Sequence, residues 1–321
     1  MNMSVELMIG NGNTLFIPCV VEGIEWTTER KGMPGKLTFE CLHDVALSVE
    51  EGNPVKLRFN DRDVFYGYIF GKSRDRVPQF KVTAYDQLRY FKNKDSYIYK
   101  YKKASEVLKM VATDYGLRIG TIEDTQYVIT SRVDDSSELF EIVQKPLDIT
   151  MTNTKKLYVL YDDAGKLMLR NVDSMKVDIL IDAETGENFS YSSSIDNSTY
   201  NRVKLIYDDE EAGRRRVYVS QDKPNMAKWG TLTYFEKLTD GTNAKLKADT
   251  LLKLYNTKTK NLRLKDCVGD IRVRAGSTIV VRLDLGDVQL SNYMLVETCK
   301  HKFKHNEHTM DLTLRGGEFI A

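Results

Sequence analysis

Alternating apolar and polar side chains predict short β-strands along the first ninety residues. The segments with this alternation are residues 37–41, 55–59, 64–70 and 80–85. Polar turn residues separate them, as in the run Asn60-Asp61-Arg62-Asp63. Short strands at this spacing favour a small barrel or sandwich. We therefore expect a first small β-barrel over residues 1–95.

The apolar period changes to that of helices in the next segment. Its first helical stripe consists of Ala104, Val107, Leu108, Val111, Ala112 and Tyr115, and Gly116 is placed to end the helix. A second helix is expected to begin with the capping-box-like run 135–138 and to bend near Pro146; its buried stripe is Leu139, Ile142, Val143 and Leu147. Residues 157–161 and 166–170 then predict a hairpin across the turn 162–165. We expect an α+β middle domain over residues 96–175.

Strands return in the last third of the chain. Residues 201–207 and 216–219 alternate around an acidic turn, and further strands are expected between residues 271 and 315. Between them, Ala244, Ala248, Leu251, Leu252 and Tyr255 fall on one face of a helix. The predicted fold class is therefore α+β and mainly β.

A weak internal repeat connects the first and last strand regions. Residues 52–59 align without gaps on residues 276–283, with Gly and Arg identical and the inward apolar positions preserved. A polar turn follows in both copies, then a strand holding Tyr68 or Tyr293, and then a third strand. This order predicts two related β-modules. If such a chain forms a trimer, six similar modules can make a ring, because closed symmetry repeats the same interface.

Composition and charge exclude several classes of protein. The chain has 321 residues, with 47 basic and 46 acidic side chains and a net charge of +1, whereas dedicated nucleic-acid binders carry a clear basic surplus. The longest strictly apolar run has only five residues (157–161), so we expect no membrane span. The start of the chain lacks the features of a secretory signal, which predicts a protein made and folded in a cytoplasm. The four widely spaced cysteines are typical of small buried side chains.

Several segments resemble a known family over nearly the whole length. They are residues 85–91 leading into the helix at Ala104, the helix-then-hairpin order of residues 139–161, Asn201-Arg202-Val203, Lys228-Trp229-Gly230 before the helix of residues 248–252, and Gly276 with the closing strands that hold His301 and Met310-Asp311-Leu312. In this order the chain resembles the baseplate hub proteins of contractile phage tails, the late control protein D family. The resemblance is greatest to the shorter hubs of Gram-positive prophages and phage-tail-like bacteriocins.

The resemblance implies an architecture, a role and partners. It implies a homotrimer whose two barrel modules continue the hexameric tail tube on one side and bind the trimeric central spike on the other. It also implies that the second tube-like barrel is discontinuous, formed by residues 176–222 and 268–321, with a helical insertion at residues 223–267. Besides spike and tube proteins, it allows tape measure, baseplate wedge and LysM-type partners, and it implies neither membrane nor sequence-specific nucleic acid as a partner. The particle is a phage tail or a DNA-free bacteriocin.

Cys299, His301, His305 and His308 are the one candidate metal site, because zinc accepts these ligand types. Cys299 and His301 share a strand face, and a turn near residue 306 returns His308 towards them. No second ligand pair such as CxxC supports a metal, so we favour a packed histidine at the barrel edge, and we expect no cofactor.

Enzymatic motifs are weaker still. The sequence has no Gly-x-Ser-x-Gly elbow, and Asp134-Asp135 and Asp162-Asp163 fit turns or helix starts. Hence we predict a structural hub and no catalytic residues. Two alternatives stay open. A cell-wall hydrolase would need a carboxylate with a raised pKa in a cleft, and a glycan-binding tail protein would need exposed aromatic residues gathered on one face.

Overall fold

The computed structural model describes residues 3–42, 49–74, 79–196, 199–209, 212–238, 243–286, 288–304 and 307–316. It divides into two compact units, of which unit 1 comprises Met1–Phe189 with Arg263–Leu314 and unit 2 comprises Ser190–Leu262 with Arg315–Ala321. The chain passes from unit 1 to unit 2 along one strand and returns along another. Across the described ranges, no helix is long and apolar enough to cross a membrane.

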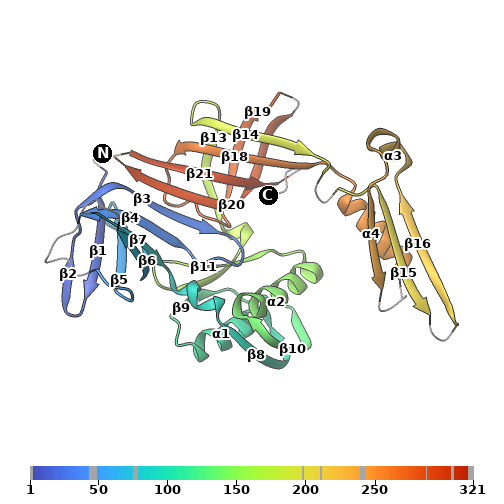
Figure 1. Ribbon diagram of the computed structural model, residues 1–321, viewed down its shortest axis with the longest axis horizontal. Helices are drawn as coiled ribbons and strands as arrows, with labels where there is room; N and C mark the ends of the chain where they lie inside the picture. Colours follow the sequence, from blue (N-terminus) through green and yellow to red (C-terminus); the bar gives the residue numbers. More distant parts are fainter. Residues whose placement is uncertain are drawn as a thin grey trace. The chain divides into compact units, whose positions relative to one another are not determined.

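Thirteen strands form one sheet (Figure 1). The first group is β1 (Val5–Asn11), β2 (Thr14–Phe16), β3 (Val20–Glu29), β4 (Lys36–Leu42), β5 (Pro54–Phe59), β6 (Arg62–Arg74) and β7 (Gln79–Tyr85). The second group is β13 (Lys176–Ile181), β14 (Gly186–Ser194), β18 (Thr259–Val268), β19 (Thr278–Asp284), β20 (Gln289–Lys304) and β21 (Glu307–Arg315). The order is β14-β18-β21-β20-β3-β4-β7-β6-β5-β1-β2. A branch leaves this order at β20, where β19 pairs with β20 and β13 pairs with β19.

The predicted alternation positions the core of the first group. In β4 and β5, every second side chain is buried, as expected for strands with one face on a core. The buried side chains of this core are Leu7, Ile9, Ile24, Trp26, Leu37, Phe39, Cys41, Val49, Val55, Leu57, Val64, Phe65, Ile69, Val82, Ala84 and Phe303. Phe303 comes from β20, so the second group contributes to the core of the first.

The two groups share this sheet and do not form two separate closed barrels, which corrects the expectation from sequence. β20 pairs antiparallel with β3, and His301 lies opposite Trp26 in this register. Neither group closes on itself through the strand pairings of the described residues. The reason is that strand alternation specifies which face is buried but does not specify which edges pair.

The two groups repeat the same local structure. Gly52 and Gly276 have left-handed φ values of 90° and 92°, which favour glycine. The N–H of Gly52 donates to the carbonyl of Ile69, and the N–H of Gly276 donates to that of Val296, at 2.8 Å in both cases. This correspondence makes Leu295 the structural equivalent of Tyr68. The alignment of the two sequence segments had instead matched Tyr68 with Tyr293, two residues earlier. The strand orders β4-β7-β6-β5 and β18-β21-β20-β19 also match.

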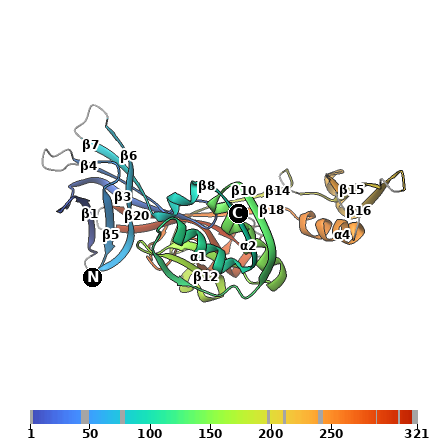
Figure 2. The ribbon, with the colours of Figure 1, turned by 90° about the horizontal axis from the view of Figure 1, so that it is seen from below.

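The middle segment of unit 1 has the expected α+β character (Figure 2). Its elements are the 3₁₀ helix η1 (Gln87–Lys92), β8 (Lys94–Lys103), α1 (Ala104–Asp114), β9 (Ile119–Ile122), β10 (Val128–Glu138), α2 (Leu139–Thr154), β11 (Tyr158–Asp162), β12 (Leu167–Asn171) and the 3₁₀ helix η2 (Val172–Ser174). The predicted stripes of α1 and α2 are buried in one core. The predicted hairpin is confirmed, because Tyr161 pairs with Met168 across the turn.

The start of α2 differs from the prediction. Residues 135–138 belong to β10, where Ser137 and Glu138 pair with Asp95 and Lys94 of β8. Glu138, the residue before the helix, makes no side-chain capping bond, and α2 continues through Pro146 to Thr154. Pairing with β8 therefore takes precedence over the capping-box signal in this run.

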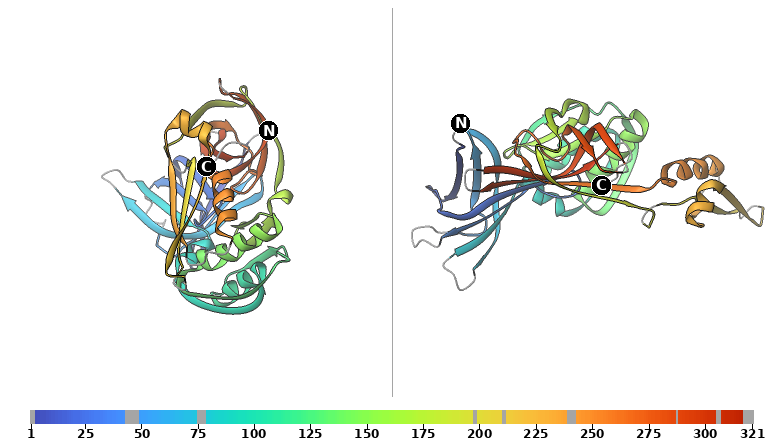
Figure 3. Two further views of the ribbon diagram at one scale, coloured as in Figure 1. Left: turned by 90° about the vertical axis from the view of Figure 1, so that its right-hand side faces the viewer. Right: turned by 90° about the horizontal axis from the view of Figure 1, so that it is seen from above.

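Unit 2 is a small α/β fold (Figure 3). Its elements are β15 (Arg202–Asp209), β16 (Arg214–Gln221), α3 (Lys223–Trp229), β17 (Thr233–Leu238) and α4 (Ala244–Tyr255). The strand order is β16-β15-β17, with β15 parallel to β17. From the sequence, residues 176–222, which include β15 and β16, were expected in the second barrel, with a helical insertion at residues 223–267. In the structure β15 pairs with both β16 and β17, and α4 packs on β15 and β16, so these strands belong to the inserted unit.

Candidate assembly surfaces

Cys299, His301 and His308 lie together, as the strand and turn pattern predicted. Cys299 Sγ is 3.2 Å from Nε2 of His301, and Nδ1 of His301 is 2.9 Å from Nε2 of His308. His305 lies outside the described residues. Within the described ranges, no group of three or more His, Cys, Asp or Glu side chains is arranged to hold a metal ion.

Both ring nitrogens of His301 are occupied by protein partners. Its Nε2 lies 2.8 Å from the carbonyl oxygen of Val273, which can only accept, so this nitrogen carries the proton. Nδ1 is then the acceptor for the N–H of His308. This arrangement leaves no lone pair of His301 directed to a metal, and the cluster acts as a packing and hydrogen-bonding device.

His301 is fully buried and His308 is half-buried, both in an aromatic environment. The His301 ring stacks on Trp26, with 4.9 Å between centroids, and the His308 ring stacks on Phe303 at 4.5 Å. Burial lowers the pKa of His301 to about 3 and that of His308 to about 4. Both rings are therefore neutral at pH 7 and help to pack β20 against β3.

This burial predicts how stability depends on pH. Between pH 6.5 and 4 the unfolded state binds protons at these histidines and the folded state does not, so stability falls as the pH falls. Each histidine contributes a slope of up to about 1.4 kcal/mol per pH unit. We expect His308→Gln to make the decline shallower in urea unfolding measured from pH 7 to 4.5. An unchanged slope would contradict the assignment of His308 as a half-buried neutral ring.

A buried ion pair joins the two strand groups beside the histidines. The guanidinium of Arg30, at the end of β3, donates to both carboxylate oxygens of Glu297 in β20, with distances of 2.7 and 2.8 Å. The backbone N–H of Arg30 also donates to the carbonyl of Glu297. Their side chains are only 5% and 15% exposed. Sequence reasoning missed this pair, because the two residues are 267 positions apart and neither belongs to a motif.

Two buried carboxylates connect the middle segment to the strand groups. Asp86 accepts from the N–H groups of Gly35 and Leu88, and Asp162 accepts from the amide of Gln87 at 2.7 Å and the N–H of Gly165 at 2.7 Å. Burial raises the pKa of Asp86 well above its ordinary value and raises that of Asp162 to about 6. These bonds connect residues of the first group with the β11–β12 turn.

Arg274 of the second group completes the connection. Its Nη2 donates to the carbonyl oxygen of Asp162 at 2.7 Å, and its guanidinium lies over the Tyr161 ring at 3.9 Å.

The raised pKa of Asp162 is a property that a catalytic carboxylate of a cell-wall hydrolase would also have. Asp162, however, is only 5% exposed, and both of its oxygens already accept hydrogen bonds from within the fold. Its surroundings are those of a structural carboxylate.

Asp162 gives a second pH prediction, of opposite sign. Its folded pKa of about 6 exceeds the ordinary value of 3.8, so the folded state binds its proton first as the pH falls from 6 to 4. This protonation offsets part of the histidine effect. We expect Asp162→Asn to make the acid decline in stability steeper than in the unmodified chain, measured by the same urea series. A shallower decline would contradict the raised pKa of Asp162.

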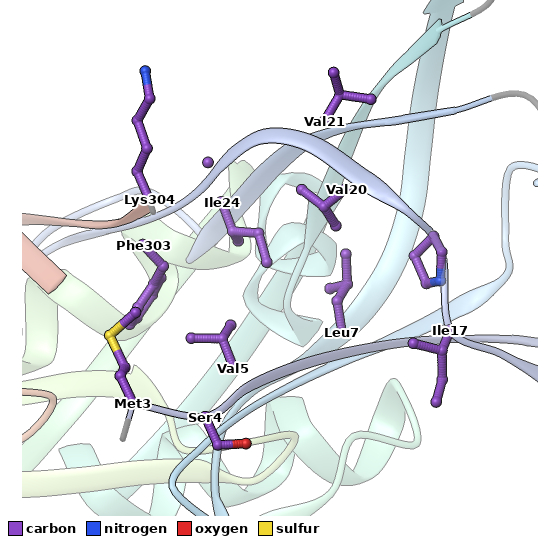
Figure 4. Close-up of a pocket in the computed structure, with 12 residues that line it drawn as sticks. Met3, Ser4, Val5, Leu7, Ile17, Val20, Val21, Ile24, Phe303 and Lys304 are labelled. Carbon is purple, nitrogen blue, oxygen red and sulfur yellow. The ribbon is translucent and has the colours of Figure 1, made fainter. Parts of the chain in front are cut away.

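An apolar groove marks the place where the first strand group fails to close (Figure 4). It has a volume of about 560 Å³ and lies between β1, β3 and the end of β20. Val5 and Leu7 of β1 lie across it from Val20 and Ile24 of β3 (Figure 4). Among the described strands, residues 5–8 of β1 pair only with β5, and residues 20–23 of β3 pair only with β4. The open groove explains why this group is not a closed barrel.

Among the strands that the structure describes, β14 and β6 have edges without a partner. β14 is the terminal strand at one end of the sheet and pairs only with β18 in the described part of the chain. In β6, residues 71–74 pair with β7 on one edge, and the β5 pairing ends at Tyr68. Unpaired edges of this kind are sites where another strand can add.

The chain is similar to a known family and to two individual proteins over most of its length. The model of a family described as YqbQ-like matches residues 24–315. The uncharacterized protein YqbQ of Bacillus subtilis is 30% identical over 312 residues, which cover 93% of each chain. Protein XkdQ of the phage-like element PBSX of Bacillus subtilis is 31% identical over 274 residues, 83% of this chain and 82% of the relative.

Solved structures share the fold at low sequence identity. The 43 kDa tail protein of prophage MuSo2 from Shewanella oneidensis has a TM-score of 0.72 and 9% identity, covering 97% of both chains. A tail protein from Neisseria meningitidis has a TM-score of 0.70 and 9% identity over the whole of both chains. The c3393 protein of E. coli, a type VI secretion component, has a TM-score of 0.55 and 9% identity, over 98% of this chain and 78% of its own. With the sequence relatives, these matches confirm the expected resemblance to phage tail proteins.

Proposed function

Because the chain belongs to the YqbQ-like family, we propose that it is a structural protein of a phage tail baseplate, and specifically the hub. In this role a trimer joins the hexameric tail tube to the trimeric central spike. The particle is a phage tail or a related contractile tail-like particle, assembled in the bacterial cytoplasm. XkdQ, the relative from a phage-like element, supports this assignment.

The observation that carries the hub proposal is the repeated strand group. The second group is paired with the first within the chain, through β20 and β3, and the equivalent edge of the first group, on β6, has no partner among the described residues. The Gly52 and Gly276 corners have the same φ and the same hydrogen bonds, which supports a duplicated module. Within the chain, residues 298–303 of β20 pair with β3. The Ile69–Val296 correspondence relates residues 298–301 of β20 to residues 71–74 of β6, the part of β6 whose outer edge is unpaired.

The strand orders support β14 of another copy as the partner for this open edge. β3 lies beside β4 in the first group, and β14 lies beside β18 in the second, so β14 occupies the position of β3. Pairing β6 of one copy with β14 of the next would repeat the β20–β3 junction between copies. Three copies then close a ring of six strand groups, since each heterologous contact is satisfied by the next copy. A three-fold assembly with six similar modules suits a hexameric tube on one side and a trimeric spike on the other.

The alternatives receive less support from the described residues. A cell-wall hydrolase needs an accessible carboxylate in a cleft, whereas Asp86 and Asp162 are buried and hydrogen-bonded. A glycan-binding protein needs exposed aromatic residues gathered on one face, whereas Trp26 is buried and the exposed Tyr101, Phe189, Phe235 and Tyr293 come from four different strands, β8, β14, β17 and β20. The proposal therefore includes no catalytic residue and no cofactor.

Electron microscopy of the purified chain tests the hub proposal. Class averages should show rings with three-fold symmetry and six similar lobes around a central channel. Rings of two-fold symmetry, or single particles of unit 1 and unit 2 without rings, would contradict the proposal. Adding the purified tube protein of the same tail should place a hexameric tube on one face of the ring only.

A further inference from the structure

One face of the unit 2 sheet is covered by its own helix and the other is not. Val203 and Leu205 of β15 pack against Ala244 and Ala248 of α4, and all four are buried. Successive side chains of a strand point to opposite faces, so the alternate positions form the second face. On it, Phe235 and Val217 are 58% and 51% exposed, whereas Ile206 on the central strand is only 7% exposed.

This second face, here called the Phe235 face, is defined by the strand register. Its residues are Arg202, Lys204, Ile206 and Asp208 of β15, Arg215, Val217, Val219 and Gln221 of β16, and Thr233, Phe235 and Lys237 of β17. Lys204 lies between Val219 and Phe235, and Ile206 lies between Val217 and Lys237. The face therefore has two mixed rows of apolar and cationic side chains.

The charge on the Phe235 face is unbalanced. It has four cationic side chains and one carboxylate, and that carboxylate already pairs with Arg215 at 2.6 Å and Lys237 at 2.9 Å. Arg202 and Lys204, both on the central strand, have no ion pair with any described residue. The Nε of Arg202 is buried without a hydrogen-bond partner, an unfavourable state that a change of this side chain's rotamer towards an acceptor would relieve.

The topology indicates the shape of the missing partner. β15 and β17 are parallel, and parallel strands are normally covered on both faces, most often by helices. α4 covers only one face of this sheet. An amphipathic helix on the other face would complete the usual three layers, with its apolar side on Phe235 and Val217 and its carboxylates near Arg202 and Lys204.

We propose that the Phe235 face of unit 2 binds an acidic amphipathic helix of another tail protein. A second copy of α4 does not suit this face, because α4 has three lysines and one aspartate. A nucleic-acid duplex does not suit this face either, since its phosphate backbone offers Phe235 and Val217 no apolar partner. The proposal rests on the chain being a tail protein and does not depend on the trimeric ring.

Site-specific photocrosslinking in cells that produce the complete tail tests this proposal. Phe235→p-benzoylphenylalanine should crosslink to one other tail protein, and mass spectrometry should locate the link in a helix with acidic residues beside its apolar stripe. Val217→p-benzoylphenylalanine provides a second label on the same face. The same label at Leu246, which is 66% exposed on α4, should not produce this link.

Charge reversal then tests the chemistry of the contact. Adding R202E and K204E to the labelled chain should reduce the crosslink at least tenfold, and changing the linked carboxylates of the partner to lysine should restore it. K253E, a reversal on α4, is the matched control and should leave the yield unchanged. A link mainly to a second copy of this chain, a link to DNA, or no link from either label would overturn the proposal. In solution, the purified R202E/K204E chain should form assemblies of the same number of copies as the unmodified chain. A lost crosslink with an unchanged number of copies separates this test from that of the hub.

Discussion

Glu297→Ala is expected to destabilise unit 1 by about 3–5 kcal/mol, because it leaves the buried guanidinium of Arg30 without its anionic partner. The Arg30 side chain is 5% exposed, so water cannot replace the two hydrogen bonds that it donates to Glu297. The measurement is urea unfolding followed by the fluorescence of Trp26, which is buried in the same unit. Trp229→Phe in all compared chains removes the signal of unit 2.

A double variant separates the loss of the pair from the loss of packing. Arg30→Met with Glu297→Leu replaces both charges by apolar side chains of similar size, and such exchanges are often neutral or stabilising. We expect the double variant to recover most of the stability lost in Glu297→Ala. If Glu297→Ala changed stability by less than 1 kcal/mol, Arg30 and Glu297 would not be the junction described above.

Two lysines on the outer strand of the sheet are expected to abolish the trimer. Lysine on an edge strand blocks edge-to-edge pairing, and Asn188 and Ser190 of β14 are exposed. The variant Asn188→Lys with Ser190→Lys should therefore be monomeric under conditions in which the unmodified chain is trimeric, as measured by analytical ultracentrifugation. Its circular dichroism should be unchanged, because β14 keeps its pairing with β18.

The matched control adds the same two charges elsewhere. Thr250→Lys with Leu254→Lys modifies exposed positions of α4 and should leave the trimer intact. A trimeric Asn188→Lys/Ser190→Lys chain would show that β14 is not part of the contact between copies.

Local structure was largely predictable from the sequence, and the reasons are local. The helical stripe starting at Ala104 gave α1, and the two-residue period gave β4 to β7. Gly52 and Gly276 lie at equivalent corners of the two strand groups, and both have a positive φ that favours glycine. Because the same backbone conformation selects the same residue, the repeat was visible in the sequence. The proximity of His308 to Cys299 and His301 followed from strand alternation and one turn.

Pairing between distant segments was not predictable. Nothing in the alternation of residues 202–207 says whether this strand joins the second group or its own small sheet, because both environments bury one face. The single sheet arises from the β20–β3 pairing, and the open groove arises from a gap between β1 and β3. Arg30, Asp86 and Arg274 became recognisable as junction residues only when the fold brought their partners to them.

The absolute mass of the purified chain in solution tests the hub proposal most directly. Light scattering over a range of concentrations should give a mass near three times 36.9 kDa, the mass of one copy. Because the proposed β6–β14 contact is heterologous, the copies join head to tail, and a closed ring of six strand groups with two groups per chain contains three copies. A mass of one or two copies at every concentration would contradict the self-assembling ring of six strand groups.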